Sequence, residues 1–193
     1  MQALHDYIIK PKGGRYNNST DVDGKNLILN TEVFNHQYVN REAEVLAVPA
    51  IGDTDIKVGD TVIVHHNVFR RWHNIRGEEK NSRSYFEEDK YFVTEDQVFA
   101  YKENDKWKPL KGYCFVKPIK NKDMFSEAKE RPLIGIVKYT DGSVDVGDLV
   151  GYEPYNEFEF IVDNQRLYRV LSNDINIIYE YQGDEEEYNP SWA

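Results

Sequence analysis

Two copies of one short pattern constrain what this chain can fold into more than any other feature does. In the first half, residues 44–48 and 61–64 are rich in β-branched and aliphatic residues, and Val58-Gly59-Asp60 precedes the second run. In the second half, residues 134–139 and Val146-Gly147-Asp148 repeat the arrangement, and another aliphatic run follows. Such runs, bounded by Gly-Asp turns, predict β-strands. The repeated order predicts an internal duplication of one β-rich unit.

The flanking segments extend both copies and set the predicted domain boundaries. Each copy opens with an apolar stretch that ends in Lys-Pro, and each closes with a Ser/Thr-x-Asp pattern before a strand. The first copy is longer, which places an insertion within residues 65–89. The sequence therefore predicts a first domain at 1–104 with a long polar loop at 12–42, a second domain at 105–182, and a solvated or disordered acidic tail at 183–193.

The composition favours β structure and argues against several function classes. The chain has 14 Tyr and 9 Phe, which are residues that favour strands. Its formal net charge of -10 argues against specific nucleic-acid binding and against anionic membrane surfaces, because both need a basic field. The sequence contains neither an apolar run of membrane-spanning length nor a signal-peptide pattern. We therefore expect no membrane partner and a cytoplasmic location.

The residue types that could carry catalysis lack the spacing that catalysis needs. The single cysteine, Cys114, alternates with aromatic and aliphatic neighbours, which predicts a buried structural thiol rather than a nucleophile. His65, His66 and His73 have no cysteine or carboxylate spacing that would complete a zinc site. The aspartates of the two Val-Gly-Asp elements are expected to accept backbone N–H bonds in their turns. The sequence thus predicts a protein that is not an enzyme and that holds no cofactor or metal.

With these residues in hand, each half resembles the small co-chaperonin (GroES) family, whose subunits close the folding chamber of a large chaperonin. Residues 108–117 are similar to the family's opening strand, residues 44–48 and 58–63 to its central strands, and residues 172–178 to its closing strand. The resemblance implies an all-β fold of two tandem GroES-like, partly open β-barrels. It also implies a homo-oligomeric ring that docks on a large chaperonin, of a host or its own, and caps the folding chamber.

The resemblance assigns a docking role to one apolar tripeptide, which its pattern alone could equally place in an ordinary strand that covers the core. Leu27, Ile28 and Leu29 lie where the family carries a mobile loop that contacts the chaperonin. A short apolar segment on a polar tether suits reversible docking, because the entropy lost on ordering keeps the affinity low. The corresponding loop of the second copy offers only Met124 and Phe125, which match a docking tripeptide weakly.

A basic cluster in the insertion is the second candidate contact. It is interleaved with aromatic residues and is the only basic cluster in an acidic chain; its members include Arg70, Arg71, Trp72 and Arg76. It could bind an acidic partner, a phosphate or a neighbouring subunit. The alternative is an exposed charged loop in which Trp72 covers the core.

A different function class is also compatible with the sequence. The two barrels could serve as rigid elements of a structural or assembly protein, such as a ring component of a virion, without binding a chaperonin. The divergence from the family, the aromatic richness and the acidic tail resemble a bacteriophage product. Under this alternative the protein would be located in the virion.

Overall fold

The structure is a computed structural model of the chain, and it describes residues 2–17, 19–22, 24–28, 38–123, 125–180, 183 and 185–190. These residues form β-strands, short 3-10 helices, turns and loops, so the predicted all-β class is confirmed. None of their helices has the length and apolar character needed to cross a membrane. The chain divides into two compact units, unit 1 at Met1–Asp105 and unit 2 at Lys106–Ala193.

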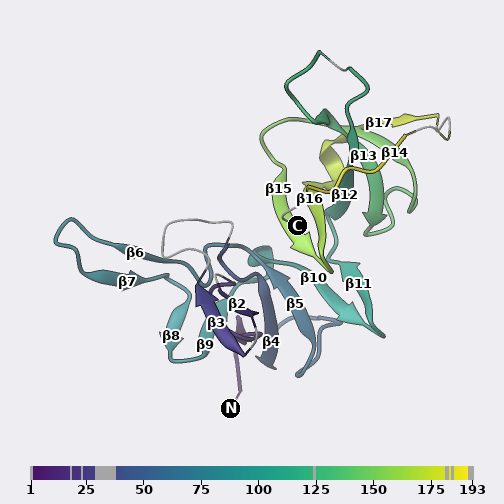
Figure 1. Cartoon of the computed structure of the whole chain (residues 1–193). Coiled ribbons are helices and arrows are strands. Elements are labelled where there is room, and N and C mark those ends of the chain that lie inside the picture. The colour runs from purple at the N-terminus through teal and green to yellow at the C-terminus, as the bar shows by residue number, and fades with distance from the viewer. Residues whose placement is uncertain are drawn as a thin grey trace. The chain divides into compact units, whose positions relative to one another are not determined.

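The strands of unit 1 lie in one large sheet and two separate hairpins (Figure 1). They are β1 (Tyr7–Pro11), β2 (Ser19–Val22), β3 (Lys25–Ile28), β4 (Glu42–Ala47), β5 (Thr61–Val64), β6 (Arg71–His73), β7 (Glu79–Asn81), β8 (Tyr85–Glu87), β9 (Lys90–Val93) and β10 (Val98–Glu103). The sheet has the order β11-β10-β5-β4-β1-β9-β8, where β11 (Lys106–Pro109) follows β10 along the chain. The 3-10 helix η2 (Glu95–Gln97) connects β9 to β10.

The sequence of β4 shows why this sheet forms. Alternate residues of the strand, Ala43, Val45 and Ala47, are buried, whereas the residues between them are partly exposed. Side chains of a strand point alternately to the two faces of a sheet, so the apolar set faces the core and the polar set faces solvent. Its two neighbours in the sheet, β1 and β5, are buried more completely along their length.

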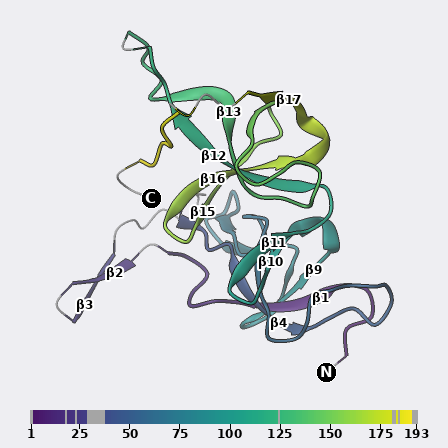
Figure 2. The same cartoon turned by 90° about the vertical axis from the view of Figure 1, so that its right-hand side faces the viewer.

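Apart from β11, the described strands of unit 2 form a single sheet with the order β15-β16-β12-β13-β14-β17 (Figure 2). Its strands are β12 (Tyr113–Lys120), β13 (Glu130–Tyr139), β14 (Leu149–Tyr152), β15 (Phe158–Val162), β16 (Gln165–Leu171) and β17 (Ile175–Tyr179). The 3-10 helix η3 (Ser172–Asp174) connects β16 to β17.

The two units have the same strand order. Reading the first sheet as β8-β9-β1-β4-β5-β10 gives the second sheet strand for strand, and η2 takes the place of η3. The strand pairings of these two sheets are antiparallel, and neither sheet closes on itself over the described residues. The repeated sequence pattern therefore corresponds to a repeated topology.

The Val-Gly-Asp elements form the same turn in both units. In unit 1, Gly59 has a φ of 94° and its N–H donates to the carbonyl of Val45 at 2.8 Å; in unit 2, Gly147 has a φ of 98° and its N–H donates to Val137 at 2.9 Å. The following aspartate closes each turn, because its carboxylate accepts the backbone N–H of the residue three positions earlier at 2.8 Å and 3.0 Å. The structural role predicted for these two carboxylates is confirmed.

The core of unit 2 contains the only cysteine of the chain. Cys114 is fully buried and clusters with Val116, Val137 and Val150. Its Sγ atom lies 3.4 Å from the hydroxyl oxygen of Ser172. The predicted burial of this thiol is confirmed, and its neighbours make it part of the sheet packing.

The C-terminal segment 185–190 packs along β12. β16 pairs with β12 only over Tyr113–Val116, which leaves the rest of that edge open. Glu187 forms an antiparallel bridge with Ile119, and the N–H of Tyr188 donates to the carbonyl of Pro118 at 2.8 Å. Segment 185–190 of the predicted acidic tail therefore lies along β12, while Glu186, Glu187 and Asn189 are exposed to solvent, as the prediction of a solvated end requires.

Charge complementarity explains why segment 185–190 lies along β12. Glu186 pairs with Lys120 of β12, and Glu187 pairs with a lysine of β13. Asn189 accepts a hydrogen bond from Nζ of Lys117, a side chain that is buried. Burial lowers the pKa of Lys117, since it disfavours the charged ammonium. The acidic segment thus pairs with lysines of unit 2 while its glutamate side chains stay exposed to solvent.

Tyr152 gives unit 2 a pH-dependent stability. Its pKa is raised well above the usual 10.0, first because burial disfavours the phenolate and then because Glu157 and Glu130 lie nearby. Above pH 10 the unfolded chain loses this proton while the folded chain keeps it, so stability falls as pH rises, by about 1.4 kcal/mol per pH unit. Tyr152→Phe should remove this part of the slope in urea unfolding measured between pH 9 and pH 11.

The matched control is Tyr155→Phe, which removes a hydroxyl from a side chain that is 94% exposed. This control should leave the slope as it is in the parent protein. An equal slope for Tyr152→Phe and the parent would contradict the assignment of the buried phenol.

Candidate functional site

The predicted docking tripeptide begins on a β-hairpin of unit 1. Leu27 and Ile28 lie in β3, which pairs with β2 in the register Thr20 to Leu27, whereas Leu29 lies outside the described residues. The side chain of Leu27 is 53% exposed. Figure 2 shows this hairpin projecting away from the large sheet of unit 1. An apolar side chain is thus presented to solvent between β1 and β4.

The segment 12–42, predicted to be a long polar loop, contains the paired strands β2 and β3. Val22 pairs with Lys25, and the two residues between them in the sequence are Asp23-Gly24. Gly24 has a φ of 75°, which a glycine adopts without steric cost. An Asp-Gly dipeptide between short strands is a strong hairpin signal, and it was available in the sequence.

The loop between β12 and β13 presents the weaker candidate, Phe125, which is 99% exposed. Its N–H donates to the carboxylate of Asp123 at 2.9 Å, and the N–H of Asp123 donates to the side chain of Asn121 at 3.1 Å. These local bonds hold the loop in a turn. Met124 lies outside the described residues.

The basic cluster lies on the β6–β7 hairpin and its base, in unit 1. Arg71 contacts other residues of unit 1. Its Nη1 pairs with Glu79 at 3.1 Å across the hairpin, and its guanidinium lies over the ring of Tyr16. The backbone N–H of Arg71 donates to the hydroxyl of Tyr16 at 2.7 Å. Arg76 lies at the exposed tip next to Ile75, which is completely exposed. The side chain of Asn74 accepts backbone N–H bonds from residues 76 and 78 and fixes this tip.

Arg15 braces the base of the hairpin, a role that the sequence did not indicate. Its Nε donates to the carbonyl of Phe69 at 3.1 Å, and its Nη1 donates to the side chain of Asn81 at 2.8 Å. Its guanidinium also lies over the rings of Tyr85 and Tyr91. Burial lowers the pKa of Arg15. The only local signal is an Arg-Tyr pair inside a Gly- and Asn-rich segment.

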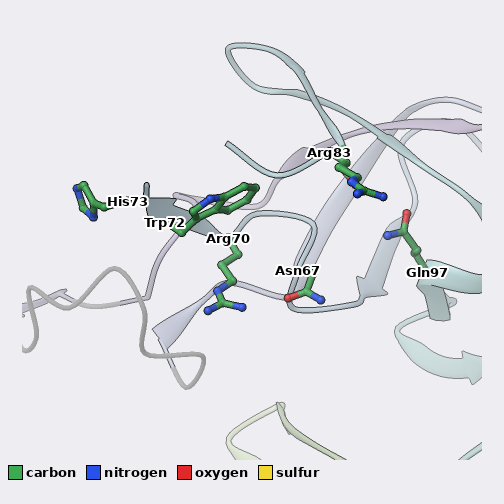
Figure 3. A pocket seen from close by; sticks show the side chains of 7 residues that line it. Asn67, Arg70, Trp72, His73, Arg83 and Gln97 are labelled. Carbon is green, nitrogen blue, oxygen red and sulfur yellow. The ribbon is translucent and has the colours of Figure 1, made fainter. Parts of the chain in front are cut away.

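A pocket of about 590 Å³ lies where the hairpin meets η2. The side chains labelled in Figure 3 line it: Asn67, Arg70, Trp72, His73, Arg83 and Gln97. The structure therefore brings Arg70 and Trp72 of the predicted cluster together with Arg83, and it places neither Arg71 nor Arg76 in the lining.

The protein core holds the pocket walls in place. Phe69, which is fully buried, packs edge-on against Tyr91 with ring centroids 4.8 Å apart and anchors the segment before β6. The carbonyl of Gln97 accepts the N–H of His65 at 2.9 Å, and Oε1 of Gln97 lies 3.3 Å from the N–H of Thr94, which donates to it. The amide nitrogen of Gln97 therefore remains as the donor end of that side chain.

The histidines of this region do not combine into a metal site. His65 and His66 follow β5 in a turn, and their rings stack with centroids 4.3 Å apart. Across the described part of the chain, no three His, Cys, Asp or Glu side chains gather in a way that could hold a metal ion.

Comparison of the sequence with protein-family models finds no match, and comparison with curated proteins finds no significant match.

Proposed function

We propose that this protein is a non-enzymatic co-chaperonin, built from two GroES-like barrel units, that docks on a large chaperonin through Leu27, Ile28 and Leu29 and caps its folding chamber. The observation that carries the proposal is the exposed Leu27 on a hairpin inserted between β1 and β4. An apolar side chain on a projecting hairpin can enter a hydrophobic groove without rearrangement of the sheet behind it.

The common strand order of the two units supports the modular part of the proposal. A chain with two copies of one sheet, each with the same Val-Gly-Asp turn, supplies two similar wall elements of a ring. Among the described residues, the projecting β2–β3 hairpin belongs to unit 1, and unit 2 has Phe125 in a shorter loop. We therefore expect one main docking element in each chain.

The edge strand β17 supports self-association. It is last in the sheet order of unit 2, and Ile177 and Ile178 are 48% and 60% exposed. Its counterpart in unit 1, β10, has β11 as a further neighbour. A strand edge with exposed apolar side chains is a template for pairing with another chain. A homo-oligomeric ring closed by such contacts is the form we propose.

Serine replacement of the tripeptide tests the docking assignment. The Leu27→Ser, Ile28→Ser, Leu29→Ser variant should lose co-sedimentation with a nucleotide-loaded chaperonin, because the apolar contact is removed, while its own oligomer keeps the parent's size. Phe125→Ser is the matched control, since it makes the same kind of change at another exposed apolar residue, and it should retain most of the binding. Undiminished binding by the triple variant would overturn the docking role.

The second candidate function is a structural or assembly protein, such as a component of a bacteriophage particle. The exposed edge of β17 favours it, because copies could pair through this edge without a chaperonin. Electron microscopy of the protein alone and mixed with chaperonin separates the two functions. Rings or longer assemblies that do not bind the chaperonin would support this candidate over the first.

A further inference from the structure

We propose that the pocket between the β6–β7 hairpin and η2 binds a small anionic ligand that carries a planar ring, of the mononucleotide class. This site is distinct from the proposed docking element at Leu27. It lies within unit 1, so it requires no other part of the chain.

The charge of the pocket selects an anion. Two arginines, Arg70 and Arg83, line it, and none of the described lining residues is acidic. Neither guanidinium has a hydrogen bond or ion pair to another described residue, and Nε of Arg70 is buried without a partner. A buried donor without a partner costs free energy, which a ligand oxygen would recover. Two unpaired guanidinium groups are unexpected in a chain with a net charge of -10.

The neighbouring arginines have more contacts with the fold than Arg70 and Arg83 do. Arg15 and Arg71 contact carbonyl, amide, carboxylate and aromatic groups around the hairpin base, although Nη2 of Arg15 and Nε of Arg71 are also buried without a hydrogen-bond partner. Arg70 and Arg83 have no such interactions among the described residues. Guanidinium groups bind phosphate oxygens in a planar, two-pronged geometry, so phosphate is the anion that fits them best.

Shape and remaining lining point to a ring attached to the phosphate. The indole of Trp72 is 37% exposed and forms part of the wall, which offers a flat surface for stacking. The amides of Asn67 and Gln97 add polar groups that can bond to the edge of a base. Figure 3 shows the arginine and amide side chains spread along the pocket instead of meeting at one point. A volume of about 590 Å³ lies within the range of small-ligand sites.

Calorimetric titration with ADP, pyrophosphate and adenosine tests the proposal on the full-length protein. We expect ADP to bind in a saturable manner and more tightly than pyrophosphate, with adenosine the weakest of the three. Arg83→Gln should weaken ADP binding at least tenfold, and since Arg83 is exposed, this variant is expected to fold normally. Arg70→Gln should have at least the same effect, and circular dichroism will verify its fold.

Arg76→Gln is the matched control, because it removes the same charge from the same hairpin but lies outside the pocket lining. It should change ADP affinity less than twofold. Equal losses for Arg76→Gln and Arg83→Gln would overturn the site in favour of a general basic field. Absence of saturable binding, equal affinity for ADP and pyrophosphate, or tighter binding of a poly-glutamate peptide would each overturn the mononucleotide assignment.

Discussion

Replacing Phe69 with Ala is expected to lower the free energy of unfolding of unit 1 by about 3 to 5 kcal/mol, the range found when a fully buried phenylalanine is removed. The ring is completely buried and packs edge-on against Tyr91, so the change leaves a cavity and also removes an aromatic contact. The carbonyl of Phe69 also receives the hydrogen bond from Arg15 that braces the β6–β7 hairpin. The variant should therefore loosen the pocket as well as the core.

Urea unfolding measures the loss of stability, and hydrogen exchange locates it. Amide protection should fall in β5, β9 and β10 of unit 1. Phe86→Ala is the matched control, because Phe86 lies in the same unit and is 54% exposed; it should cost less than about 1 kcal/mol. A loss of under 1 kcal/mol for Phe69→Ala would show that the segment before β6 is not anchored by this ring.

Replacing Gly135 with Ala should destabilise unit 2 by about 2 to 3 kcal/mol, as overpacking of a tight site does. A methyl group at this position would lie 2.4 Å from the carbonyl oxygen of Lys117 and 2.6 Å from Cγ1 of Val116. The first of these atoms belongs to the backbone of β12, which cannot move without disturbing its pairing with β13. Position 135 requires glycine because the backbone of β12 lies so close to it, and not because its φ falls in the left-handed region.

The matched control is Gly14→Ala, where the nearest atom to the new methyl group would be the carbonyl oxygen of Tyr16, 3.7 Å away. Thermal unfolding followed by circular dichroism should show a clear drop in midpoint for Gly135→Ala and little change for Gly14→Ala. The reverse order would mean that the β12–β13 contact relaxes freely. The equivalent residue in unit 1 is Ala43, which faces Pro11 as Gly135 faces Pro118.

Features set by local patterns could be predicted from the sequence. The alternation in β4 predicts a strand with one buried face, and the repeated Val-Gly-Asp elements predict two similar turns, whose carboxylates accept N–H bonds as expected. The burial of Cys114 follows from its apolar neighbours. The β2–β3 hairpin could also have been predicted, because Asp23-Gly24 is a hairpin signal inside a segment that composition alone assigns to a loop.

Features that depend on distant partners could not be predicted in this way. The acidic run near the C-terminus does not reveal from its own sequence that its glutamates pair with lysines of β12 and β13. The pocket combines four residues of the segment around β6 with Arg83, Ser84 and Gln97, and these groups approach one another only when β6, β7 and η2 are in place; the four are Asn67, Arg70, Trp72 and His73. The brace from Arg15 joins residues more than fifty positions apart. Charge and aromatic content indicate the basic cluster in the sequence. The tertiary structure is needed to separate the arginines that brace the fold from those that line the pocket.

The place of segment 185–190 on β12 also bears on the order in which the chain can fold as it is synthesised. Domains generally fold as units while the ribosome is still extending the chain. The strands β1 to β10 precede residue 104, so unit 1 can acquire most of its sheet while unit 2 is still being made. To complete its sheet, unit 2 needs β17, and to give the buried Lys117 its hydrogen-bond acceptor Asn189 it needs segment 185–190. Translation would therefore complete the two similar sheets one after the other, and docking of segment 185–190 on β12 would be the last step for unit 2.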